Sequence, residues 1–147
     1  MSSIFLILLS FIHFWQDAPV MLQNQSETLI VTVSNLKDKN SPVYLAIYNN
    51  SQNFGKEEGM YKGAKGNPNG KSTVDIQILD LVPGTYAIAI YQDTNGNGKL
   101  DTGFMGIPKE PYGFSNNFRP MFSGPTFEKC SFKFSGKTTN IHIEIIR

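Results

Sequence analysis

The chain has 147 residues, of which 40% are hydrophobic and 17% are charged, and its formal net charge is +1. This length favours one domain with a core of its own, and the composition excludes an intrinsically disordered chain. The near-neutral charge, the scattered lysines and the presence of only two arginines argue against a nucleic-acid binder, which needs a clustered basic surface.

The N-terminal part of the chain is far more apolar than the rest. Ile4 to Trp15 is an almost continuous apolar run, too short to cross a bilayer of about 30 Å but long enough for the apolar part of a secretory signal. No basic residue precedes the run, no clean cleavage site follows it, and a buried strand or helix is the alternative. We predict a signal peptide over residues 1–25, export to the bacterial periplasm or beyond, and no stable membrane span after its removal.

Residues 26–147 are predicted to form one β-sandwich domain. Six segments show the period-two alternation of β-strands, and helical periodicity is almost absent. One face of each segment is apolar, as in sheets with one wet side. We therefore predict an all-β fold, a single antiparallel Ig-like β-sandwich of about seven strands. The predicted buried positions are Leu29, Val31 and Val33; Val43, Leu45 and Ile47; Val74, Ile76 and Ile78; Tyr86, Ile88 and Ile90; Cys130, Phe132 and Phe134; and Ile141, Ile143 and Ile145.

Turn residues separate these segments. Pro83-Gly84 lies between the third and fourth predicted strands, and Ser135-Gly136-Lys137 predicts a hairpin between the last two. Two connections are long, from Asn49 to Lys71, with a short helix near Ser51 to Glu58, and from Asp93 to Thr126. Long loops in compact domains are usually functional or mobile.

The segment after the fourth predicted strand has the spacing of a calcium-binding loop. Oxygen-bearing side chains stand at its first, third, fifth and ninth positions, and a glycine stands at the sixth, where such a loop turns sharply. Calcium is therefore the predicted ion. Its predicted ligands are the side chains of Asp93, Asn95, Asn97 and Asp101 and the backbone carbonyl of Lys99.

The match to that pattern is incomplete. The twelfth position is Phe104 instead of a bidentate glutamate, and flanking helices are missing, so Glu110, Asn116 or Asn117 would have to supply further oxygens. Alternatively, the two Asn-Gly pairs are plain turn residues. The acids at both ends of the loop favour the ion. Zinc and other soft metals are disfavoured, because the predicted mature chain has one histidine and one cysteine.

A second candidate site lies in the segment from Tyr112 to Arg119. Aromatic rings beside amides and a guanidinium group suit a sugar or a peptide, through stacking and hydrogen bonds. The alternative, favoured by the rarity of exposed aromatic side chains, is a loop that packs Phe114 and Phe118 against the sandwich. The weak candidate ligand-binding residues are Tyr112, Phe114, Asn116, Asn117 and Arg119.

Enzyme chemistry has little support in the sequence. His142 lies on the face opposite the isoleucines of the last strand, which predicts a solvated histidine and leaves no Ser-His-Asp set. Cys130 is the only cysteine, which excludes an intramolecular disulfide, and its alternation with phenylalanines predicts a buried apolar role. Carboxylate pairs for a hydrolase would have to come from Asp93, Asp101, Glu110, Glu57 and Glu58.

Several motifs resemble known families. Leu81 to Tyr86 resembles the start of a strand in prealbumin-like domains such as the collagen-adhesin B-type repeats. A second set of motifs occurs in a fixed order along the chain: Tyr44 to Asn49, Pro83 to Ile88, Asp93 to Asp101, Gly106 to Pro108 and Tyr112 to Asn117. Through these motifs, residues 28 to 147 resemble the uncharacterised exported bacterial family called domain of unknown function 2141. That resemblance implies export and a β-sandwich and supplies no activity.

These observations predict an exported, non-catalytic β-sandwich module that Ca²⁺ stabilises. Its expected partner is a glycan, a peptide or another envelope protein, bound through the two long loops. The alternatives are a hydrolase that uses acidic loop residues and a purely structural envelope protein.

Overall fold

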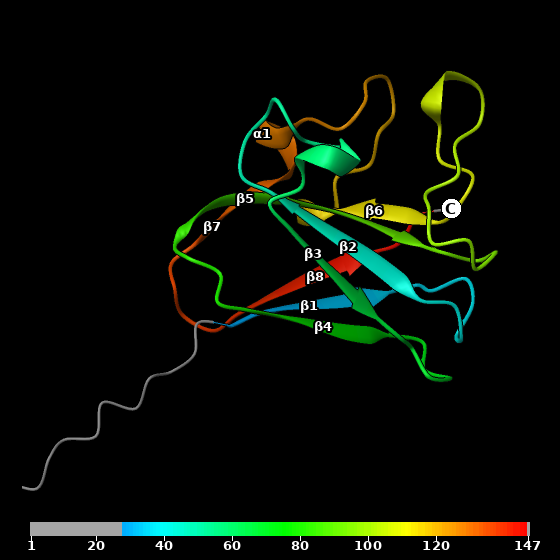
Figure 1. Ribbon diagram of the computed structural model, residues 1–147, viewed down its shortest axis with the longest axis horizontal. Coiled ribbons are helices and arrows are strands. Elements are labelled where there is room, and N and C mark those ends of the chain that lie inside the picture. The colour runs from blue at the N-terminus through cyan, green and yellow to red at the C-terminus, as the bar shows by residue number, and fades with distance from the viewer. Residues whose placement is uncertain (1–27, 147) are drawn as a thin grey trace, which may run out of the picture.

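The computed structural model describes residues 28–146, and the predicted signal peptide lies outside them (Figure 1). The described chain is almost entirely strand and loop, with one short α-helix and three 3-10 helices. The strands are β1 (Thr28–Ser34), β2 (Val43–Tyr48), β3 (Lys62–Gly66), β4 (Val74–Leu79), β5 (Gly84–Gln92), β6 (Tyr112–Phe114), β7 (Ser131–Phe134) and β8 (Thr139–Glu144). The helices are η1 (Glu57–Gly59), η2 (Phe104–Gly106), η3 (Ser115–Asn117) and α1 (Phe127–Cys130).

The strands form two sheets that face each other across one core. The smaller sheet has the order β4-β1-β8, and the larger has the order β3-β2-β5-β6, with β7 also paired to β5. The predicted all-β sandwich is confirmed. One pair departs from the antiparallel arrangement, because β1 and β8 run parallel.

The predicted hairpin at Ser135 to Lys137 is wrong. β7 pairs with β5 and β8 pairs with β1, so this segment crosses from the larger sheet to the smaller one. Phe134 and Ile143 are both buried in the shared core, and opposite sheets present them to it. The turn residues correctly predicted that the chain reverses here. They carry no information about which strands β7 and β8 pair with.

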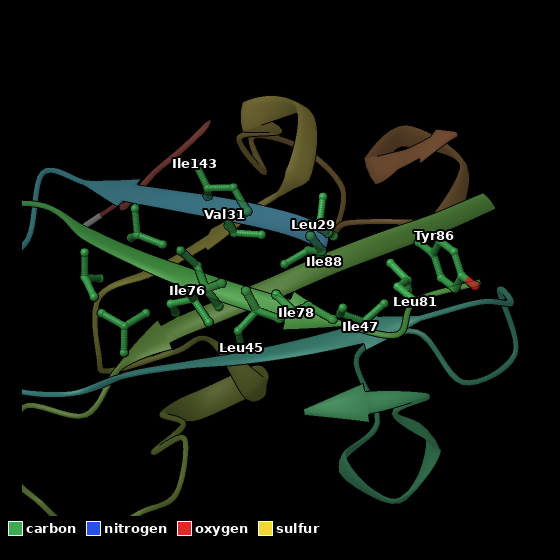
Figure 2. Close-up of a cluster of buried hydrophobic side chains, with 14 of the residues drawn as sticks. Leu29, Val31, Leu45, Ile47, Ile76, Ile78, Leu81, Tyr86, Ile88 and Ile143 are labelled. Carbon is green, nitrogen blue, oxygen red and sulfur yellow. The ribbon is translucent and has the colours of Figure 1, made fainter. Parts of the chain in front are cut away.

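The core contains the apolar faces that the alternation predicted. Leu29, Val31 and Val33 are fully buried, and Figure 2 shows neighbouring side chains from both sheets directed toward one another. Burying one such side chain contributes about 1.5–3 kcal/mol. Leu36 and Leu81, outside the predicted strand positions, join the same cluster.

Two short strands lie inside segments that were predicted to be long loops. Both contain a buried glycine at a close approach to the core. A Cβ on Gly66 in β3 would stand 2.7 Å from Ile76, and one on Gly113 in β6 would stand 3.0 Å from Ile143. β3 has no alternating large apolar side chains and β6 has only three residues, so periodicity could not reveal them.

The predicted helix near Ser51 to Glu58 is also wrong. Residues 51–55 form a turn, and only Glu57–Gly59 is helical, as one 3-10 turn. Gly55 has a φ of +80°, which a continuing right-handed helix does not allow. No helix within residues 28–146 is long and apolar enough to span a membrane.

Candidate functional site

The Asp93 to Asp101 loop leaves the larger sheet at the end of β5 (Figure 1). Gln92, the last residue of that strand, is fully buried and bonds to the connection between β1 and β2. Its Oε1 accepts from the Lys37 backbone N–H at 2.8 Å, and its Nε2 donates to the carbonyls of Asp38 and Ser41. The loop therefore starts from a fixed base.

Asp93 is only 2% exposed, and its carboxylate organises the loop around itself. Oδ1 accepts hydrogen bonds from the backbone N–H groups of Gly96 at 2.8 Å and Asn97 at 3.2 Å, and Oδ2 accepts one from Gly98 at 2.8 Å. Gly96 and Gly98 have φ values of +75° and +74°, a region that L side chains rarely adopt. The glycines thus let three consecutive N–H groups turn toward one carboxylate.

Glu110 holds the same loop from its far side. It is 4% exposed, and its two oxygens accept from the backbone N–H groups of Thr94 at 2.9 Å and Asp101 at 3.2 Å. Within the described part of the chain, the one ion pair is remote, between Arg119 and Glu144. Two buried carboxylates are therefore balanced by backbone dipoles, without a lysine or arginine partner.

Three polar side chains converge in the outer part of the loop. The amide nitrogens of Asn95 and Asn97 both donate to Oδ2 of Asp101, at 2.5 and 2.9 Å. The amide oxygens accept from backbone N–H groups, that of Asn95 from Asn97 at 3.1 Å and that of Asn97 from Lys99 at 2.8 Å. An amide oxygen has two lone pairs, so the side-chain oxygens of Asn95 and Asn97 each keep capacity for a second partner, whereas Oδ2 of Asp101 already accepts two bonds.

The donor types on this loop are those that a hard cation takes, but the amide nitrogens of Asn95 and Asn97, and not their oxygens, face Asp101. All five predicted ligand residues lie on this one loop, and their side-chain and carbonyl oxygens are the type that Ca²⁺ prefers. Between residues 28 and 146, no three His, Cys, Asp or Glu side chains gather closely enough to hold a metal by themselves, so amide and carbonyl oxygens would have to contribute. Phe104 at the twelfth position is 88% exposed and offers no oxygen.

Of the three residues predicted to supply further oxygens to the ion, only Glu110 contacts the loop. Glu110 lies against the loop, whereas Asn116 and Asn117 bond elsewhere. Asn116 donates to the backbone carbonyls of Lys129 and Ser131, next to β7. Asn117 pairs with β8, donating to the carbonyl of His142 and accepting from the N–H of Glu144 at 2.7 Å. Both asparagines have positive φ, and together they connect the two sheets.

The aromatic segment folds back on the sandwich. The centre of the Phe114 ring lies 5.7 Å from that of Tyr112 and 6.2 Å from that of Phe54. Tyr112 and Phe114, at the two ends of β6, are both half-buried. Arg119 is paired with Glu144 at 2.8 Å. These contacts agree with the alternative in which the segment packs its aromatic side chains against the sandwich. A ligand-binding role for the segment stays a prediction.

Tyr91 is a contributor to the loop that the sequence reasoning missed. Its hydroxyl donates to the Gly98 carbonyl at 3.2 Å, and its ring stacks on Tyr44 with the centroids 5.2 Å apart. Burial, with the neighbouring Tyr44, Asp93 and Glu110, raises the pKa of Tyr91 to about 12. The feature of the sequence that could have revealed this contact is a tyrosine on the outer face of the fourth predicted strand, two residues before the loop begins.

The candidate nucleophiles and bases are poorly placed for catalysis. His142 is exposed, as predicted, and its Nε2 lies 2.7 Å from the Ser34 hydroxyl. Among the residues described, no carboxylate bonds to its ring. Cys130 is fully buried, and burial raises its thiol pKa to about 11, so the thiol is protonated at neutral pH.

Comparison with known proteins identifies the family of this chain. A family model described as an uncharacterized protein conserved in bacteria (DUF2141) matches residues 31–142, in agreement with the resemblance of the motifs. No curated protein and no solved structure matches significantly.

Proposed function

This chain belongs to that uncharacterised bacterial family, and from that premise we propose that it is an exported, non-catalytic β-sandwich module stabilised by Ca²⁺. The ion would be held by Asp93, Asn95, Asn97 and Asp101 and by the Lys99 carbonyl. The partner class is a glycan, a peptide or another envelope protein, recognised through the two long connections, residues 49–71 and 93–126.

The observation that carries the calcium proposal is the pair of buried carboxylates that hold one loop. Asp93 and Glu110 are 2% and 4% exposed, and neither has a cationic side chain as partner within residues 28–146. A buried charge is costly unless it is compensated, and here backbone N–H groups alone compensate it. A divalent cation at the mouth of the loop would add a full positive charge beside Asp93, where Asp101 is partly exposed.

The same geometry supports a non-catalytic role. Catalytic carboxylates in hydrolases need oxygens free to exchange a proton or attack a substrate. Both oxygens of Asp93 and both of Glu110 already accept backbone N–H groups. These carboxylates therefore fix the loop conformation instead of facing a substrate cleft.

Thermal unfolding of the full chain with excess Ca²⁺ and with a chelator tests the ion. A ligand present at 100 times its dissociation constant stabilises the folded state by about 2.7 kcal/mol, which raises the Tm by several degrees in a domain of this size. Identical melting curves with and without Ca²⁺ contradict the proposal.

The matched variants are Asp101→Asn and Asp75→Asn. Asp101→Asn keeps the shape of the side chain and removes its charge, so the calcium-dependent Tm shift should shrink strongly. Asp75 lies on β4 and accepts from the Thr32 hydroxyl at 2.7 Å, away from the loop, so its variant should keep the full shift. The double variant Asp93→Ala with Asp101→Ala should abolish it.

Export is tested separately in the native bacterial host. The mature protein should be recovered from the envelope or culture fraction, and its N-terminus, read by mass spectrometry, should lie close to residue 26. Recovery of the intact chain in the cytoplasm would contradict export without bearing on the ion.

A further inference from the structure

Four large apolar side chains stand almost free in solvent on two loops. Phe104 is 88% and Ile107 62% exposed around η2, and Met121 is 82% and Phe122 99% exposed before α1. Folded monomers rarely leave such side chains grouped at the surface without a partner. We call residues 104–107 and 121–122 the two apolar tips.

The two loops that carry the tips project from the same side of the sandwich in Figure 1. There the η2 loop, in yellow-green, and the orange loop that precedes α1 both extend beyond the strands. They are separate projections, and a deformable, extended surface can contact both at once.

Each tip has a lysine at its base. The Cε and Cγ atoms of Lys109 lie 3.6 and 3.8 Å from the position of a Cβ on Gly103, directly before η2. Nζ of Lys129 donates to the Ser123 hydroxyl at 3.1 Å and stands 5.3 Å from the centre of the Phe118 ring.

Acidic side chains lie near these lysines as well. Asp101 accepts from two side-chain amides, Glu110 is buried, and Glu128 in α1 is the exposed acid closest in sequence to the second tip. Lys109 and Lys129 are both exposed, so the surface below the tips combines apolar side chains with accessible ammonium groups beside these acids.

We propose that the two apolar tips dock this domain on an anionic lipid bilayer. Aromatic side chains favour the interfacial region of a membrane, and lysines near the surface are attracted by anionic headgroups. Phe104, Ile107, Met121 and Phe122 enter the interface, while Lys109 and Lys129 remain at headgroup level. This binding is reversible and peripheral, and it does not depend on the proposed calcium ion.

Co-sedimentation with vesicles tests the proposal, using phosphatidylcholine vesicles with and without phosphatidylglycerol and a chelator in the buffer. The full chain is compared with the double variant Phe104→Ser and Phe122→Ser. The control is Leu79→Ser with Val82→Ser, which removes apolar residues that are 50% and 54% exposed near the start of β5. Any binding through residues 1–27 is common to all three proteins.

The tip variant should bind anionic vesicles at least about tenfold more weakly than the unmodified chain, and the control should bind equally well. Lys109→Gln with Lys129→Gln should weaken binding to anionic vesicles while sparing the weaker binding to neutral ones. Equal vesicle binding by the tip variant and the unmodified chain overturns the proposal. So does the absence of any vesicle binding, which would assign the tips to a protein partner.

Discussion

Asp93 and Glu110 are both buried and hold one loop from two sides, without contacting a cationic side chain in the described chain. Asp93 accepts from three N–H groups in the middle of the loop, and Glu110 accepts from the second and ninth residues, Thr94 and Asp101. Glu110 thereby fixes the distance between the two arms of the loop. Its role is to position the loop, whether or not it also contacts an ion.

Replacing Glu110 with glutamine should destabilise the protein. The amide keeps the shape of the side chain but has one oxygen, so either the Thr94 or the Asp101 N–H loses its acceptor at a partly buried site. A lost partner of this kind costs about 1–3 kcal/mol. Urea unfolding of the variant should show a lower midpoint with an unchanged slope.

Glu58→Gln is the matched control for this substitution. Glu58 lies in η1 and is exposed, so the same chemical change there should alter the free energy of unfolding by less than about 0.5 kcal/mol. An equal loss in both variants would mean that Glu110 has no specific role in the loop.

The fold was largely predictable because burial follows the alternation of side chains. Val31, Ile47 and Ile88 occupy the core as their spacing indicated. Pairing between strands was less predictable, since a turn such as Ser135 to Lys137 does not encode its partner strands. β3 and β6 were missed because glycine, at Gly66 and Gly113, replaces the apolar side chain that would have marked them.

The candidate loop was predictable in part, because its acids and glycines follow one another in the sequence. The contribution of Tyr91 depends on how the larger sheet places its ring beside Tyr44. The specific positions of Asn116 and Asn117 were unpredictable for the same reason: β7 and β8, distant in sequence, are brought to them by the fold. Contacts between segments that are distant in the sequence leave no local sequence pattern from which they could be predicted.

Ser115 completes the sheet where two strands meet end to end. β6 and β7 pair with the same side of β5, and Ile88 falls between them. The Ser115 hydroxyl accepts from the Ile88 N–H at 2.8 Å and donates to the Cys130 carbonyl at 2.5 Å. Ser115→Ala should therefore destabilise the protein by about 1–3 kcal/mol, measured by urea unfolding.

Ser123→Ala provides the comparison for that variant. Ser123 is exposed, and its hydroxyl accepts from the Lys129 ammonium group, which water can replace. Its removal should leave the unfolding midpoint almost unchanged. A midpoint for Ser115→Ala as high as that of Ser123→Ala would show that water can fill the gap beside Ile88.

Tyr91 links the stability of the protein to alkaline pH. Burial raises its pKa from 10.0 to about 12, so between these values the folded state retains a proton that the unfolded state has released. The folded state then binds more protons than the unfolded state, and stability falls as the pH rises through this window. Loss of the proton also removes the donor to the Gly98 carbonyl.

Tyr91→Phe should therefore weaken the decline of stability between about pH 10 and 12 and remove one late step from the ultraviolet titration of tyrosinate. Because burial also raises the pKa of Tyr48 and Tyr86, the difference between the variant and the unmodified chain is the quantity to measure. Tyr112→Phe, which does not touch Gly98, should keep the late step. If Ca²⁺ occupies the loop, its positive charge favours the phenolate, so adding Ca²⁺ should lower the pKa of Tyr91. A late step that persists in Tyr91→Phe would assign it to another tyrosine and remove this connection between the aromatic pair and the loop.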